Sequence, residues 1–365
     1  MTLDPDLKIP TVAETVSHPS FPTALWNLEP DRAGLCPVAE GRGGPLEINY
    51  EVHGNGPVKL VFIMGLGGLL TGWQRQTFYF GHLNRDKYSV LVFDNRGVGA
   101  SGKPLMRYSS SEMARDVYDL VTSPEVDFLP AEEEEQKRCL HIVGISLGGM
   151  IAQEFACLYP WTVSSLALCC TAPEIKNYSL TWLENIKSRI GMLVPKSPDE
   201  SVAAVARQIF AHSWLALPDD AELPVAGRDP KVLPPAGADG KEYGKFESNA
   251  QRFVAQEMHK RMDKSKFGLK GFLLQLIAAG WHRKSEGELK KMAEGVGRER
   301  ILIMHGTEDG MISLPHGEVL MEWVKPGRGL VVEGMGHAPS MERTKWFNEL
   351  IGEWCAMGER LDGRL

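Results

Sequence analysis

The chain has 365 residues, of which 43% are hydrophobic and 24% are charged, and its formal net charge is −7 at pH 7. This length and apolar content suffice for a large buried core, arranged as one big domain or two smaller ones. Because lysines and arginines are scattered among acidic residues, the charge pattern argues against nucleic acid as a partner. No apolar stretch approaches the roughly 18 residues of a membrane-spanning helix, so we expect no membrane span.

The amino-terminal part of the chain has a different pattern from the rest. Residues 1–40 contain several prolines and no sustained hydrophobic period, which predicts an extended arm on the surface of the core. The start, Met1 to Leu7, lacks the basic residues and apolar centre of a secretory signal, so we expect a cytoplasmic protein. The six cysteines show no C-x-x-C spacing and are expected to be free thiols. No histidine pair with a nearby carboxylate lies at helical spacing, so neither a metal nor another cofactor is expected.

Strands and helices alternate from residue 46 onward, a pattern typical of a parallel sheet covered by helices. Apolar runs predict strands at 46–53, 58–64, 90–94, 140–145 and 165–170, and a helix at 112–121. The strand at 58–64 ends in the glycine-rich turn Met64-Gly65-Leu66-Gly67-Gly68. The strand at 90–94 runs into the turn Asp94-Asn95-Arg96-Gly97-Val98-Gly99-Ala100-Ser101.

The segment Gly144-Ile145-Ser146-Leu147-Gly148 is the most informative part of the sequence. It follows an apolar run and precedes a helix-like segment that extends to Tyr159. A strand that turns into a helix within one residue forces that residue into a strained backbone conformation, and flanking glycines avoid clashes with it. The pattern therefore predicts that the hydroxyl of Ser146 projects from the edge of the sheet as a nucleophile.

After Pro173 the strand pattern stops until residue 300, and the intervening sequence predicts helices. These helices are expected at 180–194, 200–211, 245–263 and 270–281. The segment 217–240, which lies between them, is rich in proline and glycine and predicts a loop that is a candidate flap.

A serine becomes a nucleophile when a base removes its proton, and a carboxylate must orient that base. A predicted strand at 300–304 runs into a glycine-containing turn that ends in Asp309, and the next strand, at 329–332, runs into a glycine-rich turn that ends in His337. Asp309 is therefore the expected orienting acid and His337 the expected base. His305 is the main alternative to His337, but it precedes the acid and is expected to pack beneath it.

Together these features resemble the α/β-hydrolase superfamily. The resemblance covers roughly residues 45–172 and 298–360, and it rests on the serine elbow, the order of serine, acid and histidine, and the segment 94–101, which is similar to the D-x-R-G-x-G-x-S turn of the family. It implies an α/β-hydrolase fold, with a mostly parallel central sheet, helices on both faces and an inserted helical cap. It also implies that Asp94 and Arg96 form a structural ion pair and cap loop backbone behind the active site. The implied domains are an arm at 1–40, a core at 41–173 and 298–365, and a cap at 174–297.

The resemblance also implies an oxyanion hole formed by the backbone N–H groups of Leu66 and Leu147. The family commonly has a histidine where this chain has Met64, a change that should alter packing beneath the loop without removing the backbone donors. Side chains of the cap would shape the substrate pocket. The candidate substrate contacts are Gly65, Trp182, Trp214, Phe272 and Leu276.

The expected function is hydrolysis of a small to medium hydrophobic carboxylic ester or lactone through an acyl-enzyme. The sequence does not distinguish these substrates from a thioester or an amide. A serine at the elbow argues against haloalkane dehalogenase and epoxide hydrolase activity, because those relatives need a carboxylate there. Two alternatives stay open, an acyltransferase with the same triad and a ligand receptor of this fold with negligible turnover. The expected partner is a small-molecule ester, and an apolar cap edge could pair with a second copy as a homo-oligomer.

Overall fold

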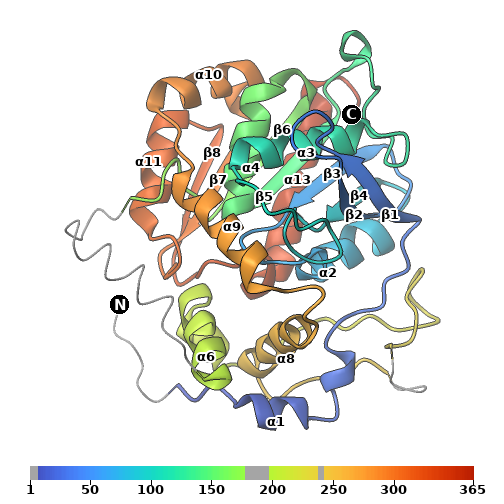
Figure 1. The fold of residues 1–365 in the computed structure, drawn as a ribbon, viewed down its shortest axis with the longest axis vertical. Helices are drawn as coiled ribbons and strands as arrows, with labels where there is room; N and C mark the ends of the chain where they lie inside the picture. Colours follow the sequence, from blue (N-terminus) through green and yellow to red (C-terminus); the bar gives the residue numbers. More distant parts are fainter. Residues whose placement is uncertain (1–6, 177–196, 237–241) are drawn as a thin grey trace.

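An eight-stranded sheet lies at the centre of the computed structural model, which describes residues 7–176, 197–236 and 242–365 (Figure 1). The strands are β1 Arg32–Val38, β2 Leu46–His53, β3 Val58–Ile63, β4 Tyr88–Phe93, β5 Leu140–Ile145, β6 Val163–Cys169, β7 Ile301–Gly306 and β8 Arg328–Val332. Their order in the sheet is β1-β2-β4-β3-β5-β6-β7-β8. β2 is antiparallel to both β1 and β4, and every other neighbouring pair is parallel. The mostly parallel sheet confirms the fold class predicted from the sequence.

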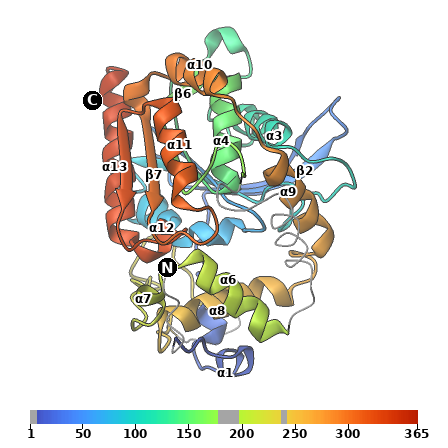
Figure 2. The same ribbon diagram turned by 90° about the vertical axis from the view of Figure 1, so that its left-hand side faces the viewer.

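Helices cover both faces of this sheet (Figures 1 and 2). The α-helices of the described residues are α1 Val12–Val16, α2 Gln74–Gln76, α3 Ser110–Thr122, α4 Leu147–Leu158, α6 Pro198–Ile209, α7 His212–Leu215, α8 Asn249–Met262, α9 Leu269–Trp281, α10 Glu286–Val296, α11 Leu314–Val324, α12 Pro339–Glu342 and α13 Thr344–Leu361. None of them combines the length and the apolar character that crossing a membrane requires. The six cysteines are free thiols, as expected.

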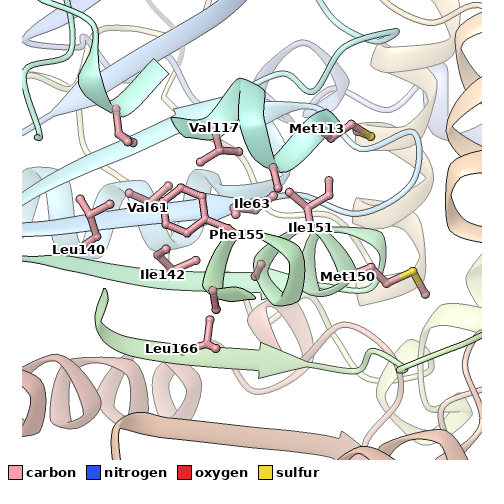
Figure 3. Packing of buried hydrophobic residues seen from close by; sticks show 14 of the residues in the cluster. Val61, Ile63, Met113, Val117, Leu140, Ile142, Met150, Ile151, Phe155 and Leu166 are labelled. Atoms are coloured by element: carbon pink, nitrogen blue, oxygen red, sulfur yellow. The ribbon is translucent and has the colours of Figure 1, made fainter. Parts of the chain in front are cut away.

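Alternate residues of each central strand face opposite helical layers. In β3, Val61 and Ile63 belong to the apolar cluster that includes α3 and α4, where Figure 3 shows them packed near Phe155. Leu60 and Phe62 face the other cluster, which includes α13. Because both faces are covered, the central strands are largely apolar, and this explains the apolar runs that predicted them.

The helices of the expected cap take part in an apolar cluster of their own. Figures 1 and 2 show α1, α6 and α8 gathered at one end of the molecule, away from α10. Phe210, Phe253 and Val254 are among the buried residues of this cluster. The helices expected at 200–211, 245–263 and 270–281 correspond to α6, α8 and α9. The helix expected at 180–194 lies within 177–196, outside the described residues, and is not tested.

Three elements pack differently from the expected division into arm, core and cap. Residues 32–38 of the expected arm form β1, an edge strand whose first four residues are not buried, so its apolar pattern is weak. The short helix α1 packs with the cap cluster through Val12 and Val16. By contrast, α10 lies within the expected cap range but contributes Leu289 and Met292 to the core cluster that includes α4.

The predicted ion pair between Asp94 and Arg96 is wrong. The guanidinium of Arg96 donates two hydrogen bonds of 2.5 Å to Asp116 of α3. Asp94 instead accepts the N–H groups of Leu70 at 2.9 Å and Ala100 at 3.0 Å, and so fastens the turn after β4 to the segment that follows β3. Closeness in sequence suggested the wrong partner, because the helix that covers the turn supplies the carboxylate.

Replacing Asp116 by alanine should lower the free energy of unfolding by about 3–5 kcal/mol, because it leaves a buried guanidinium without its carboxylate. Arg96 is only 1% exposed, so water cannot replace the lost partner. Urea denaturation measures the change. The matched control, Asp86→Ala at an exposed site, should stay within about 0.5 kcal/mol of the wild type. A loss for Asp116→Ala no larger than that of the control would contradict the assignment.

Candidate active site

Ser146 lies at the sharp turn between β5 and α4. Its backbone angles are φ 58° and ψ −124°, and a positive φ is rare for a residue other than glycine. The turn is held by a hydrogen bond of 3.0 Å from the Ser146 N–H to the carbonyl of Cys169. The hydroxyl of Thr171 donates to the Ser146 carbonyl at 2.8 Å. Such strain persists only where the surroundings enforce it, and it concentrates at functional sites.

The glycines on either side of Ser146 allow the elbow to pack closely. A Cβ at Gly144 would lie 2.3 Å from the carbonyl oxygen of Gly148, and a Cβ at Gly148 would lie 2.1 Å from that of Ile63. Both positions therefore exclude any side chain. The G-x-S-x-G pattern is required here by contacts between β5, α4 and β3.

Asp309 and His337 meet after the ends of β7 and β8. The Nδ1 atom of His337 lies 2.7 Å from Oδ2 of Asp309, and both residues are buried. The other carboxylate oxygen accepts the N–H groups of Met311 at 2.9 Å and Ile312 at 2.8 Å. Burial opposes ionisation of Asp309, but the attraction of His337 and hydrogen bonds from His305 and His337 outweigh it and hold the pKa of this carboxyl below its ordinary value. The carboxylate is thus charged and fixed against the imidazole.

His305 lies beneath this carboxylate, as the sequence led us to expect. Its Nε2 atom is 2.7 Å from the carbonyl oxygen of Ile312 and 3.2 Å from Oδ2 of Asp309. The ring is fully buried, and a Cβ at Gly317 of α11 would lie 2.4 Å from its Nδ1. The enclosed ring therefore supports the acid, and it is not placed to act as the base.

The strand order brings Ser146 to the same edge as the acid and the histidine. β5, β6 and β7 are adjacent and parallel, so their carboxyl ends lie side by side. Cys170, directly after β6, has its Sγ within 4.8 Å of a carboxylate oxygen of Asp309 and a ring nitrogen of His337. Among the hydrogen bonds of the described residues, none joins Ser146 to His337. Such catalytic contacts commonly tighten only when a substrate binds.

Cys170, Asp309 and His337 form a donor set that a metal ion could in principle use. A cysteine binds metal as the thiolate, and burial raises the pKa of the Cys170 thiol well above its ordinary value. The hydrogen bond between the other two residues would also have to break. We therefore interpret the three residues as an acid–base pair with a buried neighbour, and we assign no metal site.

The glycine-rich loop after β3 lies against Ser146. A Cβ at Gly65 would be 2.9 Å from Cβ of Ser146 and 3.5 Å from its Oγ, so glycine alone permits this contact. Within the described part of the chain, no hydrogen bond uses the N–H of Leu66 or of Leu147. Leu147 begins α4, where the first N–H groups have no partner inside the helix. Two unengaged backbone donors in these segments match what an oxyanion hole requires.

Gln275 of α9 holds the same loop, and the sequence analysis missed it. Its Oε1 accepts the N–H of Gly67 at 2.8 Å, and its Nε2 donates to the carbonyl of Arg96 at 2.8 Å. The side chain is fully buried in a helix that is otherwise largely apolar. A lone glutamine within such a helix was the available signal, because buried amides need hydrogen-bond partners.

Two of the candidate substrate contacts lie near the elbow or the glycine-rich loop after β3. Gly65 contacts Ser146, and the ring of Phe272 would be 3.0 Å from a Cβ placed on Gly67. Leu276 is half-buried, four residues further along α9 than Phe272. These apolar groups suit a hydrophobic substrate.

Of the other two candidates, Trp214 and Trp182, the structure describes only Trp214. Trp214 is buried in the cap cluster, its ring stacks on Phe210 at 4.8 Å between centroids, and its indole N–H donates to Asp220 at 2.9 Å. It packs as cap core, which is the usual role of an aromatic residue at helical spacing. Trp182 lies outside the described residues.

Comparisons with known proteins agree with this architecture. A protein-family model described as the alpha/beta hydrolase fold matches residues 59–344. A protein named carbamate hydrolase RutD from Variovorax paradoxus is 29% identical over 173 residues, which are 47% of this chain and 59% of that protein. The 3-oxoadipate enol-lactonase 2 of Acinetobacter baylyi is 31% identical over 129 residues, which are 35% of this chain and 43% of that protein. The chain thus spans about half the length of the curated relatives it matches.

A solved structure of a bacterial membrane phospholipase A superposes on this chain with a TM-score of 0.61. The alignment covers 96% of this chain and 91% of the other, at 21% sequence identity. At this identity, the match is evidence for a shared fold and for nothing further.

Replacing Gln275 by leucine should loosen the loop beside Ser146, because the N–H of Gly67 loses its acceptor in a buried place. We expect the rate at which a fluorophosphonate probe modifies Ser146 to fall about tenfold, which corresponds to about 1.4 kcal/mol. Peptide mass spectrometry at timed intervals measures this rate. The control, Gln256→Leu on α8, removes a hydrogen bond to Ala24 and should leave the rate unchanged. Equal rates for both variants would exclude the role assigned to Gln275.

Proposed function

This chain belongs to the α/β-hydrolase family, and from that premise we propose that it is a serine hydrolase that cleaves a carboxylic ester or lactone through an acyl-enzyme intermediate. One observation carries the proposal. Ser146 stands on a strained elbow at the edge of the sheet where Asp309 and His337 are hydrogen-bonded to each other at 2.7 Å. An activated serine needs this combination of an exposed hydroxyl, a base and an orienting acid.

The proposed reaction proceeds by two acyl transfers. The Oγ of Ser146 attacks the substrate carbonyl carbon, and Nε2 of His337 takes its proton. Asp309 holds the proton on Nδ1 and stabilises the imidazolium that forms. The N–H groups of Leu66 and Leu147 stabilise the tetrahedral oxyanion. The imidazolium then protonates the leaving oxygen as the C–O bond breaks, and water releases the acid from Ser146 by the same sequence of steps.

The identity of the elbow residue and the relatives both favour chemistry at an acyl carbon. A carbamate and an enol-lactone, named in the matched relatives, each present an acyl carbon to a nucleophile. A carboxylate nucleophile, which haloalkane dehalogenase and epoxide hydrolase relatives need, is replaced here by Ser146. The apolar side chain of Phe272, which lies beside Gly67, favours a hydrophobic acyl or leaving group.

The same residues would also serve acyl transfer to an alcohol. Product analysis in the presence of added alcohols separates this reaction from hydrolysis, because transfer yields a new ester at the expense of free acid. A receptor of this fold would instead bind a ligand tightly while turnover of every ester offered stays near background. A substrate series of graded acyl length, together with lactones, distinguishes these outcomes and sizes the pocket.

Replacing Ser146 by alanine should abolish turnover of the best ester in that series, with a loss of about 10⁵–10⁶-fold, because no other group forms the acyl-enzyme. Modification by a fluorophosphonate should disappear as well. Steady-state kinetics and intact-protein mass spectrometry measure the two effects, and Ser265→Ala at an exposed site serves as the control. Modification of the wild-type protein at a residue other than Ser146 would refute the assignment.

Replacing Asp309 by asparagine should lower kcat by about 10³–10⁴-fold with little change in KM, because an amide favours the wrong imidazole tautomer and cannot stabilise the imidazolium. The fold should remain intact, which circular dichroism verifies. Asp86→Asn, at an exposed position, is the matched control and should retain wild-type kcat. A variant Asp309→Asn that kept wild-type kcat would remove Asp309 from the mechanism.

A further inference from the structure

An exposed apolar surface lies on the outer side of α9, a helix that runs along one side of the molecule (Figure 2). Leu269, Leu273, Ile277 and Trp281 are spaced four residues apart, so they follow one side of this helix. Leu269 is 69% exposed and Trp281 is 65% exposed. A helix at the surface of a globular protein normally turns polar and charged residues outward. In α9 the outward side is apolar instead.

The opposite side of α9 packs against the turns that follow β3 and β4. The buried residues of the helix are Gly271, Gln275 and Ala278. Gln275 accepts the N–H of Gly67, and a Cβ on Gly271 would lie 1.8 Å from the carbonyl oxygen of Gly97. Because close packing fixes this side, the helix cannot rotate to bury its apolar outer side.

The segment that follows β4 continues the apolar surface. The N–H of Gly99 donates to the carbonyl of Lys266, just before α9, at 2.7 Å. The guanidinium of Arg107 lies 4.7 Å from the centroid of the Trp281 ring, near the other end of the helix. Leu105, which lies between these two contacts in the sequence, is 76% exposed. Two segments far apart in the chain therefore expose apolar side chains beside each other.

The approach to α9 is rich in basic residues. Residues 260–270 include five basic residues and one acidic residue, although the whole chain has a net charge of −7. The basic residues that lie near a carboxylate are Lys260, Arg261 and Lys266. Lys264 and Lys270 are exposed and form no ion pair with any described residue. The apolar surface is thus locally positive on an otherwise acidic protein.

We propose that α9, the turn 263–268 and residues 103–107, together called the α9 surface, dock onto an anionic lipid bilayer. Exposed leucine and tryptophan side chains on one side of a helix bury their apolar parts at the boundary between headgroups and acyl chains. Tryptophan suits this boundary because its ring is apolar and its indole N–H is polar. Lys264 and Lys270 are free to approach the anionic headgroups. The protein lies on the bilayer and does not cross it.

The charges of the α9 surface favour a bilayer over a second copy of the chain. A two-fold symmetric dimer places the same patch of both copies against each other. Lys264 and Lys270 of one copy would then face the same basic patch of the other, and like charges repel. Lysine is also depleted at protein–protein interfaces. An anionic bilayer supplies the opposite charge.

The α9 surface also indicates a substrate class, and this part of the inference rests on the proposed function. Phe272 and Gln275 of the same helix contact the glycine-rich loop that lies against Ser146. The diameter of a helix with its side chains is on the order of 10 Å, so a docked α9 brings this loop close to the bilayer. The substrates are therefore amphiphilic esters with a long acyl chain that are held in the bilayer.

The first test measures sedimentation with vesicles of phosphatidylcholine alone and of phosphatidylcholine mixed equally with phosphatidylglycerol. The wild type should bind the mixed vesicles more tightly. Lys264→Gln combined with Lys270→Gln should weaken this binding about thirtyfold. The control, Lys290→Gln combined with Lys291→Gln on α10, makes the same change of charge at exposed sites and should bind as the wild type does.

Three results of this test would overturn the proposal. They are a wild type that does not bind the mixed vesicles, equal binding of the wild type to both kinds of vesicle, and an equal loss in the two double variants. The apolar part is tested by Leu269→Ser, which should weaken binding to the mixed vesicles about tenfold. Leu365→Ser is the matched control, because Leu365 is also 69% exposed, and it should bind as the wild type does. Equal binding by these two variants would contradict burial of α9 in the bilayer.

The second test locates the contact on the protein. Hydroxyl radicals followed by peptide mass spectrometry should oxidise Trp281 in the free protein, and the mixed vesicles should protect it. Trp161, which is 38% exposed at a different site, should be oxidised equally with and without vesicles. If Trp281 is protected without vesicles, a second copy or another part of this chain already covers the surface, and the proposal fails. Light scattering then identifies a dimer.

The third test concerns the substrate. With a long-chain nitrophenyl ester carried in the mixed vesicles, the variant Lys264→Gln with Lys270→Gln should hydrolyse about tenfold more slowly than the wild type. With a short-chain, water-soluble nitrophenyl ester, the two proteins should have the same rate. An equal loss on both substrates would overturn delivery from the bilayer. If the wild type hydrolyses neither ester, the proposed function fails, whereas vesicle binding still decides whether α9 docks.

Discussion

The architecture of the site depends on one backbone constraint, the positive φ of Ser146 between β5 and α4. This conformation costs on the order of 1–3 kcal/mol, and the packed glycines and the hydrogen bonds from Ser146 and Thr171 enforce it. Because β5, β6 and β7 are parallel neighbours, the elbow shares its edge of the sheet with the loops that follow β6 and β7. The strain therefore serves to present a hydroxyl where the acid and the imidazole are already fixed.

Two helices of the expected cap contribute to this geometry through hydrogen bonds. Gln275 of α9 holds the loop of Gly67, and the end of α6 accepts the N–H of His337. Leaving one such buried group without a partner costs about 1–3 kcal/mol, so displacement of either element would disturb the oxyanion loop or the base. α9 thus supports the loop of Gly67, and α6 supports the loop of His337. The positions of these two helices therefore affect the arrangement of the reacting groups.

How much of this could be predicted from the sequence depends on how local each signal is. The central strands are continuous apolar runs, and the G-x-S-x-G elbow, Asp309 and His337 each follow such a run directly, so pattern and spacing sufficed. The edge strand β1 was not predicted, because burial begins only at its fifth residue. The partner of Arg96 was assigned wrongly, and Gln275 was missed, because in both cases the contact joins residues that only tertiary packing brings together. Periodicity identifies a buried face, but it does not identify the polar group that this face meets.

Two buried carboxyl groups, those of Asp309 and Glu342, illustrate how different contacts at similar burial shift a pKa in opposite directions. Asp309 has two histidines beside it, so its pKa lies below the ordinary value, and its contribution to stability is lost only as the pH falls through that low value. Glu342 accepts hydrogen bonds from the N–H groups of Gly336 and Ala211, but burial outweighs them and raises the pKa of its carboxyl to about 7. Since Gly336 and His337 are consecutive, the carboxyl group of Glu342 and the carbonyl of Ile209 hold the backbone on which the imidazole stands, and this links the position of α6 to that of His337.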